Sequence, residues 1–416
     1  MKLSKSNRVM AASAIGNMLE WYDFALYGYF AIAIGHNFFP KENPVVQVIS
    51  AFGIFAIGFL MRPLGALVLG NIGDKYGRTH ALTISIIAMA VPTFLVGVLP
   101  GYATLGIAAP ILLIMCRMAQ GLSVGGEFTT SFIFTVEHAP THRRGLMSAL
   151  CVSGATLGTL LGSATGAGIS SFMSPDDLQA WGWRIPFLFG LLIGIVGYVL
   201  RKGVEDNTEP TLEKVPLQSL FKNHYVLLIQ IAGLSVFTAV GFYFTFVYMV
   251  SWLEIVDKLA PEKALSINTM SMIALIAIII LTGWLSDHIG RKLIMLVALL
   301  AAAIFGMPLF QLMYHADPTT VLFAQLGIAL MIGSFLGTMP AFLVEAVPEH
   351  IRCTAIAIGY NLTVGVLGGL VPLIASWMIK RTANELSPGY LLISAAIISF
   401  LVLLTIKKIP IGTKRA

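Results

Sequence analysis

Residues 70–79 read GNIGDKYGRT, and residues 283–292 read GWLSDHIGRK. Both stretches fit the frame G-x-x-x-D-x-x-G-R. Their aspartates, Asp74 and Asp287, are 213 residues apart, about half of the 416-residue chain. In a membrane protein, an internal duplication of this length is typical of two helical bundles that move against each other around a central site.

A second repeat lies in the later part of each half. Residues 137–144 read EHAPTHRR and residues 345–352 read EAVPEHIR, so Glu137 and Arg144 correspond to Glu345 and Arg352 at an offset of 208 residues. The two offsets are similar, which indicates that the duplication extends over each half and is not confined to one motif.

The composition predicts a membrane protein. Hydrophobic residues make up 57% of the chain and charged residues only 11%, whereas a soluble domain carries about 25% charged residues. Apolar stretches of about 20 residues, the length that crosses a bilayer, recur throughout. We expect twelve spans, near 10–34, 46–70, 80–99, 106–134, 146–172, 184–201, 224–250, 264–286, 293–313, 321–345, 354–379 and 388–406.

The expected fold is therefore an all-α membrane protein with twelve transmembrane helices in two pseudo-symmetric six-helix bundles. Residues 1–201 would form the first bundle, 202–223 a polar cytoplasmic linker, and 224–416 the second bundle. We expect a monomer within the lipid bilayer.

The positive charges predict the topology. With the N-terminus inside, the inner segments hold eighteen of the 26 Lys and Arg residues and the outer segments six. Because Lys and Arg concentrate in cytoplasmic loops, both termini are expected in the cytoplasm. The net charge of +6 is thus explained by topology, and we expect no nucleic-acid partner.

The sequence offers no catalytic constellation. It contains no Walker phosphate loop, no H-E-x-x-H motif and no paired-cysteine metal site. We therefore expect no enzyme activity, no cofactor and no metal. ATP-driven pumping would need a nucleotide-binding domain that these residues do not encode.

Five ionisable residues fall inside the predicted spans of the first half: Glu20, Asp23, Arg62, Arg117 and Glu127. Charges at membrane depth cost about 2.5 kcal/mol or more each, so they face a wet cavity or one another. Three carboxylates with two guanidiniums leave one acid in excess. We expect Asp23, Arg117 and Glu127 to form a proton-coupling group, in which an acid binds and releases the proton as its surroundings change and the arginine stays charged. The alternative is a static ion-pair network that fixes the helices.

Arg62 is the candidate for a substrate carboxylate, which an arginine binds with two hydrogen bonds. Tyr27, Tyr243 and Tyr248 are the aromatic residues that we expect to line the cavity with Glu20, because a substituted ammonium binds to aromatic rings. The alternative for each ring is simple packing, or an aromatic belt at the membrane interface.

Several segments together resemble a known family. The repeated G-x-x-x-D-x-x-G-R loop and R-x-x-x-G at residues 117–121 are similar to the major facilitator superfamily. Within it, four stretches resemble the metabolite:H⁺ symporters, and residues 360–372 are most similar to the proline/betaine transporters of that family. The four stretches are GNMLEWYDF (16–24), RPLG (62–65), GLSVGGE (121–127) and GWRIPF (182–187).

The resemblance implies alternating access in a bacterial inner membrane, with spans 1, 4, 7 and 10 lining the cavity. It also implies cytoplasmic gates around the two repeated aspartates, each of which suits pairing with a nearby arginine and capping of a helix N-terminus. The residues assigned to these gates are Asp74, Arg78, Glu137, Arg144, Asp287, Arg291, Glu345 and Arg352.

These observations predict a proton-coupled importer of a small organic acid or zwitterion, such as proline or betaine. A di- or tricarboxylate symporter of the citrate or 2-oxoglutarate type is the nearest alternative, although such a substrate would need a second deep cation. A drug antiporter fits less well, because span 5 lacks the expected proline. A non-transporting nutrient receptor or a passive channel on the same bundle also stays open.

Overall fold

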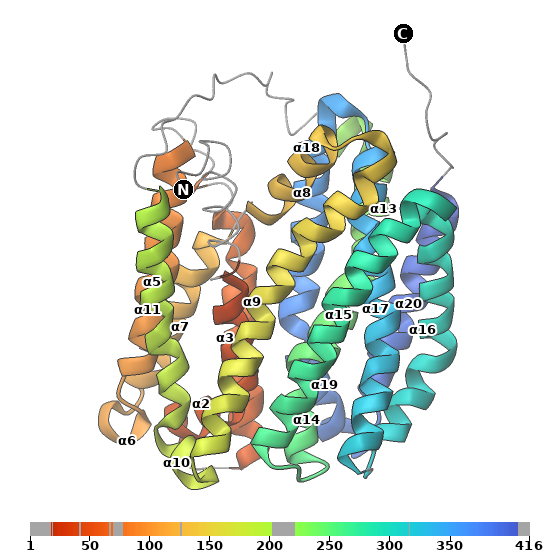
Figure 1. Ribbon diagram of the computed structural model, residues 1–416. Coiled ribbons are helices and arrows are strands. Elements are labelled where there is room, and N and C mark those ends of the chain that lie inside the picture. The colour runs from red at the N-terminus through yellow and green to blue at the C-terminus, as the bar shows by residue number, and fades with distance from the viewer. Residues whose placement is uncertain are drawn as a thin grey trace.

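The computed structural model describes residues 18, 20–40, 43–65, 68–69, 78–124, 127–201, 221–315 and 317–406. Its described residues are helical with short connections and contain no strand. The helices form twelve rods, each overlapping one predicted span (Figure 1). We call residues 18–201 the first half and residues 221–406 the second half.

The rods of the first half begin with helical residues 20–29, which lead into α2. The elements that follow are α2 (Ala31–Phe38), α3 (Pro44–Leu60), α5 (Arg78–Val98), α7 (Ala108–Ser123) with α8 (Glu127–His138), α9 (Arg144–Phe172) and α11 (Ile185–Arg201). Two short helices, α6 (Tyr102–Leu105) and α10 (Pro175–Ala180), lie in connections at the lower end of Figure 1.

The second half repeats this order. Two of its rods contain a π-helical turn, η3 and η5, where the backbone hydrogen bonds shift register. The elements are α13 (Tyr225–Tyr243) with η3 (Phe244–Tyr248) and α14 (Met249–Ile255), α15 (Pro261–Ile289), α16 (Arg291–Met313), α17 (Pro318–Ala346), α18 (Arg352–Thr363) with η5 (Val364–Gly368) and α19 (Gly369–Thr382), and α20 (Gly389–Thr405).

Several helix starts follow from local sequence. Asn43 precedes α3 and Asp317 precedes α17, and each side chain accepts a hydrogen bond from a backbone N–H of the first helical turn. Pro44 and Pro318 follow at the first helical position, where a missing N–H costs nothing. These caps fix where the two helices begin.

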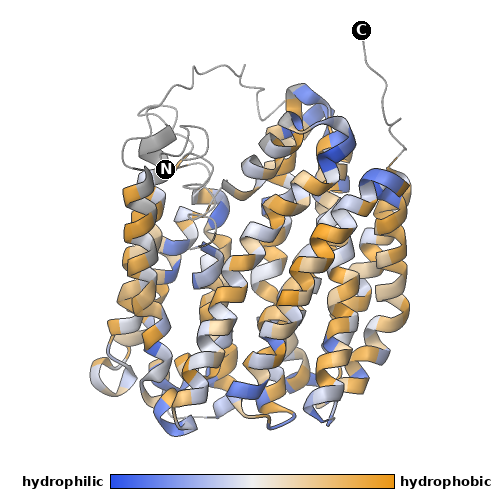
Figure 2. Ribbon diagram, in the orientation of Figure 1, coloured by the Kyte–Doolittle hydropathy of each residue, from blue (hydrophilic) through white to orange (hydrophobic). Residues whose placement is uncertain are grey.

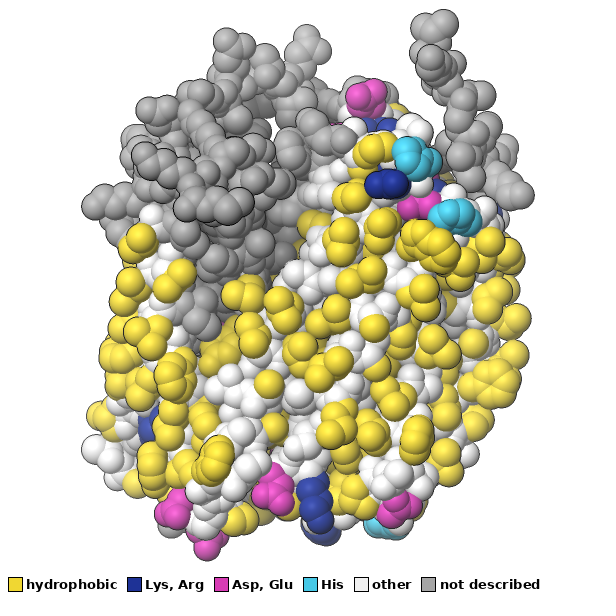
Figure 3. Space-filling view, in the orientation of Figure 1, with side chains coloured by type: hydrophobic (Ala, Val, Ile, Leu, Met, Phe, Trp, Pro, Cys, Tyr) yellow, Lys and Arg dark blue, Asp and Glu magenta, His cyan; other side chains and the backbone are white. Residues whose placement is uncertain are grey.

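The outer surface matches a bilayer. Seven helical stretches are long and apolar enough to span it, and shorter apolar helices occupy other rods, among them Ala108–Ser123 and Gly389–Thr405. Apolar residues dominate the middle of the rods, and hydrophilic residues gather at the two ends (Figure 2). The visible face in Figure 3 likewise has a hydrophobic band, with charged side chains mainly at its lower and upper edges.

The most extensive contacts between the two halves are made by α9 against α15 and α3 against α19, and α8 and α9 also contact α17. Glycines allow these close approaches. A Cβ on Gly283 of α15 would lie 2.3 Å from the Cβ of Ala149 in α9, and one on Gly369 would lie 2.4 Å from the Cβ of Phe59 in α3. The interface between the halves therefore depends on residues without side chains.

Candidate functional site

A cavity of about 30 Å³ lies between the two halves. By that measure a water needs about 10–15 Å³, so the cavity has room for about two waters and must widen to admit a metabolite. Its lining comes from helix 20–29, α8, α9, α13, α17, α18 and η5. The lining residues are Trp21, Phe128, Val152, Ala155, Thr156, Thr238, Phe242, Tyr243, Leu336, Tyr360 and Val364.

Three polar side chains of this lining have a buried atom without a hydrogen-bond partner among the described residues. They are Nε1 of Trp21, Oγ1 of Thr238 and the hydroxyl of Tyr243. Nε of the neighbouring Arg62 is likewise buried and has no hydrogen-bond partner among the described residues. All four atoms carry a proton to donate, and a buried donor left unpaired costs about 1–3 kcal/mol. The site therefore suits a ligand with hydrogen-bond acceptors.

Arg62 forms an ion pair with Glu20, with 2.8 Å between Nη2 and Oε1. Its guanidinium carbon lies 5.1 Å from the ring centre of Phe59, and that ring lies 5.1 Å from the ring of Tyr243. The pair is almost entirely buried. Removal of one partner from a buried ion pair is costly because the other charge is left uncompensated. A ligand that carries both a positive and a negative charge would compensate both partners when they separate.

Aromatic rings surround the cavity on several sides. The ring of Trp21 lies 5.6 Å from Phe242 and 6.3 Å from Tyr243. The ring of Phe128 lies 5.7 Å from Tyr360 on the second half. Such rings attract a cation through their negative faces, and they come from both halves.

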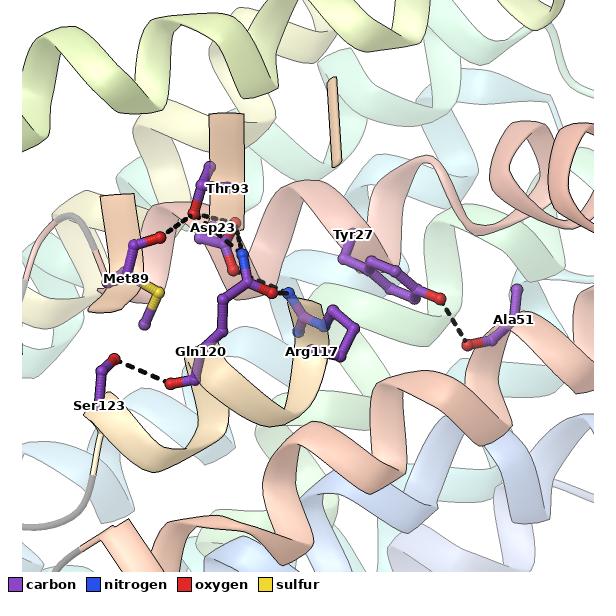
Figure 4. Close-up of polar contacts among 8 residues, drawn as sticks. All are labelled: Asp23, Tyr27, Ala51, Met89, Thr93, Arg117, Gln120 and Ser123. Carbon is purple, nitrogen blue, oxygen red and sulfur yellow. Dashed lines mark hydrogen bonds and ion pairs between the residues drawn. The ribbon is translucent and has the colours of Figure 1, made fainter. Parts of the chain in front are cut away.

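A second polar cluster connects helix 20–29 with α5 and α7 (Figure 4). Oδ2 of Asp23 accepts a hydrogen bond from Nη1 of Arg117 at 2.7 Å. Its Oδ1 accepts from Nε2 of Gln120 and from the hydroxyl of Thr93, both at 2.8 Å. Asp23 and Arg117 are completely buried, so solvent reaches this pair only after the helices move.

Aromatic packing encloses Arg117. Its guanidinium carbon lies 4.6 Å from the ring centre of Phe24 and 4.5 Å from that of Tyr27. The hydroxyl of Tyr27 donates to the carbonyl oxygen of Ala51. Tyr27 thus covers the Asp23 cluster and does not contribute to the lining of the cavity.

The remaining predicted residues of the membrane interior are distributed as follows. Tyr243 lines the cavity, whereas Tyr248 packs against Phe52 and Phe244 at ring distances near 6.1 Å. Glu127 is the first residue of α8, and its side chain lies outside the described residues. Glu20 and Asp23 each pair with one arginine. The third acid predicted within the spans, Glu127, has no described side chain.

Six of the predicted gating residues have described side chains, and they contact one another where α8, α9, α15, α16, α17 and α18 begin or end. We call this group the upper latch, because these helix ends lie at the upper end of Figure 1; its members are Glu137, Arg144, Asp287, Arg291, Glu345 and Arg352. Glu137 of the first half pairs with Arg352 of the second at 2.5 Å. Glu345 of the second half lies 4.0 Å from Arg144 of the first and 3.0 Å from Arg291. Each acid thus lies within ion-pair distance of the corresponding base of the opposite half, and Glu345 also pairs more closely with Arg291 of its own half.

Asp287 explains the repeated motif. Its carboxylate accepts hydrogen bonds from the backbone N–H groups of Gly145 and Leu146 at 2.8 and 2.9 Å, where α9 begins, and from Arg291 at 3.0 Å. The following Gly290 has φ = +95°, a conformation that side chains disfavour, and it turns the chain sharply from α15 into α16. Asp74 and the Arg78 side chain lie outside the described residues.

Neutral contacts close the opposite end. The hydroxyl of Ser163 in α9 lies 2.8 Å from that of Thr269 in α15, and Asn268 donates to Ser163 at 3.2 Å. Tyr29 contacts the sulfur of Met272 at 3.6 Å. Among the described residues, contacts between the halves thus include charged pairs at the upper end and neutral ones at the lower end.

Neutralising the upper latch should open it. We expect Glu137→Gln combined with Glu345→Gln to raise the ratio of the state open at the upper end to the closed state by about two- to thirtyfold, since surface pairs contribute about 0.2–1 kcal/mol each and two are removed. Spin labels at Thr141→Cys and Glu349→Cys, in a background without native cysteines, would measure the distance distribution. Asp176→Asn, at an exposed position of the lower end, is the matched control; an unchanged distribution in the double variant would contradict the prediction.

Sequence reasoning missed two threonines. Thr238 lines the cavity and Thr93 binds Asp23, yet a threonine in an apolar helix usually bonds to its own backbone and gives no signal of a site. Trp21 and Tyr360 lay within stretches that carried the family resemblance, but no feature of the sequence placed them around one cavity.

The comparisons with known proteins agree with this fold. A sequence model described as Major Facilitator Superfamily matches residues 13–371. The proline/betaine transporter of Salmonella typhimurium is 35% identical over 97% of this chain and 84% of its own length. A glycine betaine/proline/ectoine/pipecolic acid transporter of Dickeya dadantii is 34% identical over 96% of this chain and 83% of its own.

Solved structures share the architecture. A crystal structure of a D-xylose-proton symporter superposes with a TM-score of 0.78 at 17% identity, covering 97% of this chain and 98% of its own. An inward open xylose transporter of E. coli gives 0.73 at 19% identity, covering 98% and 97%. The predicted twelve-helix fold is confirmed: this chain belongs to the major facilitator superfamily, and it is an integral membrane transporter and not an enzyme.

Proposed function

We propose that this protein is a proton-coupled symporter that imports a small zwitterion of the proline or betaine type. It would work as a monomer in the bacterial inner membrane, with both termini and the upper latch on the cytoplasmic side. The substrate site would be the cavity between the halves, and the protons would pass through the cluster around Asp23.

The unpaired donors around the cavity carry this proposal. Trp21, Thr238, Tyr243 and Arg62 each hold a proton without an acceptor among the described residues, and a carboxylate would satisfy them. Its cationic end would lie against Glu20 and the aromatic rings. A zwitterion would thus replace both partners of the Arg62–Glu20 pair, and neither charge would be left alone.

Proton coupling would follow from Asp23. Protonation would remove the charge that binds helix 20–29 to Arg117 of α7, so the helices could rearrange when the substrate is bound. In the reverse direction, the three donors on Asp23 would favour release of the proton. Glu127 remains a candidate for a second coupling acid.

The charges disfavour a di- or tricarboxylate substrate. Among the described residues, Arg62 is the arginine that adjoins the cavity, and the lining residues contributed by the second half are uncharged. Two or three carboxylates would leave at least one negative charge buried without a partner, which is costly.

Uptake by purified full-length protein in proteoliposomes tests the function. With an alkaline interior, we expect proline or glycine betaine to accumulate about tenfold per pH unit for one proton, because each unit stores about 1.36 kcal/mol. A protonophore should abolish the accumulation. Accumulation of citrate or 2-oxoglutarate, without that of proline or betaine, would overturn the substrate assignment.

A further inference from the structure

Thr93 sits between two hydrogen-bond acceptors and has one proton to donate. Its Oγ1 lies 2.8 Å from Oδ1 of Asp23 and 2.7 Å from the carbonyl oxygen of Met89, one turn earlier in α5 (Figure 4). It also accepts a hydrogen bond from Nε2 of Gln120 at 2.9 Å. A hydroxyl donates one hydrogen bond and accepts two, so it serves one acceptor at a time.

The two acceptors match the two protonation states of Asp23. When Asp23 is ionised, Thr93 donates to Oδ1 and accepts from Gln120. When Oδ1 carries a proton, Asp23 donates that proton to Oγ1 of Thr93, and the Thr93 hydroxyl turns to the carbonyl of Met89. Gln120 donates to Oδ1 and Oγ1 in both states, and no heavy atom has to move.

We propose that Thr93 is a positioning residue for proton coupling, a hydroxyl rotor that satisfies Asp23 both with and without its proton. The inference rests on the proposed role of Asp23 as the proton carrier. It explains how a carboxyl group that is completely buried can gain a proton without leaving an unpaired group, which would cost about 1–3 kcal/mol.

Among the described residues, few other charged groups lie near this cluster. Arg117 of α7 is the direct partner of Asp23, and Glu20 on the same helix pairs with Arg62 beyond α3. Cys116 adjoins Arg117 in the chain. Arg184, which directly precedes α11, donates hydrogen bonds to the carbonyl oxygens of Gly97 and Leu99 at the far end of α5. The pH response of Thr93 variants would therefore report mainly on Asp23.

Thr93→Val keeps the shape of the side chain but removes the hydroxyl. The ionised carboxylate then loses a charge-assisted bond, whereas the protonated form loses a neutral bond of about half that strength. We expect the pH dependence of uptake at low substrate to move toward higher pH by about one unit. Thr93→Ser retains a hydroxyl and should keep the pH profile of the unmodified protein.

The measurement uses initial uptake of proline or betaine in proteoliposomes from pH 5 to 9, with thermal unfolding to verify that the variants are folded. A profile of Thr93→Val that superposes on that of the unmodified protein would overturn the rotor. So would an equal shift in Thr93→Ser. Asp23→Asn separates this outcome from failure of the proposed function. If that variant still couples uptake to the pH gradient, Asp23 is not the proton carrier, and the proposed role of Thr93 is wrong as well.

Discussion

Replacement of Arg62 by Ala is expected to lower uptake by about 100-fold, because the substrate carboxylate loses its charged partner at a cost of about 3 kcal/mol. Arg62 lies just after α3, next to the cavity, and pairs with Glu20 at 2.8 Å. The measurement is initial uptake in proteoliposomes, normalised to the amount of protein incorporated.

Loss of folding needs a separate control. The single variant breaks the buried ion pair by removing Arg62 from Glu20, and such a change destabilises a protein by about 3–5 kcal/mol. The double variant Arg62→Gln with Glu20→Gln removes both charges together. Its unfolding temperature should lie closer to that of the unmodified protein, yet it should not transport. Arg381→Ala, at an exposed site at the lower end of α19, should transport normally. Full uptake by the double variant would remove Arg62 from the substrate site.

Replacement of Asp23 by Asn should separate substrate movement from the proton gradient. The amide keeps the shape of the side chain but cannot take up a proton, so uptake should stop at equal concentrations inside and outside. The accumulation of about tenfold per pH unit should then disappear. Exchange of labelled for unlabelled substrate needs no net proton movement and should persist.

Accumulation and exchange are measured in the same proteoliposomes, with and without an imposed pH gradient. Asp257→Asn is a matched control, because Asp257 lies in the connection between α14 and α15 and contacts His315 outside the spans. If Asp23→Asn still accumulates substrate in proportion to the gradient, the proton must bind elsewhere, and Glu127→Gln becomes the next test.

Hydropathy and the repeated motif predicted the fold, because membrane spans follow from apolar length and the motif marked the duplication. The limits of prediction lie in local helix geometry. The expected span 224–250 continues to Ile255 through the π-helical turn η3, and the expected span 106–134 contains α7 and α8, with residues 125 and 126 outside the described residues. A π-helical turn leaves the apolar composition of a span unchanged.

The site was only partly predictable. Glu20 and Asp23 are three residues apart in helix 20–29, which corresponds to 300° of rotation, so their side chains diverge by about 60°. Glu20 therefore reaches Arg62 just after α3, whereas Asp23 reaches α5 and α7. Among the described side chains, the predicted buried charges form two separate ion pairs. One sequence does not reveal which neighbouring helix each side chain meets.

The crossed pairs of the upper latch, Glu137 with Arg352 and Glu345 with Arg144, have an evolutionary consequence. Each half supplies one acid and one base at equivalent positions, as the two subunits of a symmetric homodimer do. A half-length ancestor could therefore have closed on its own twin through the same two contacts. Fusion of the duplicated genes would then have preserved both contacts and allowed the two halves to diverge. The first half could thus keep Glu20, Asp23, Arg62 and Arg117 without equivalent residues in the second half.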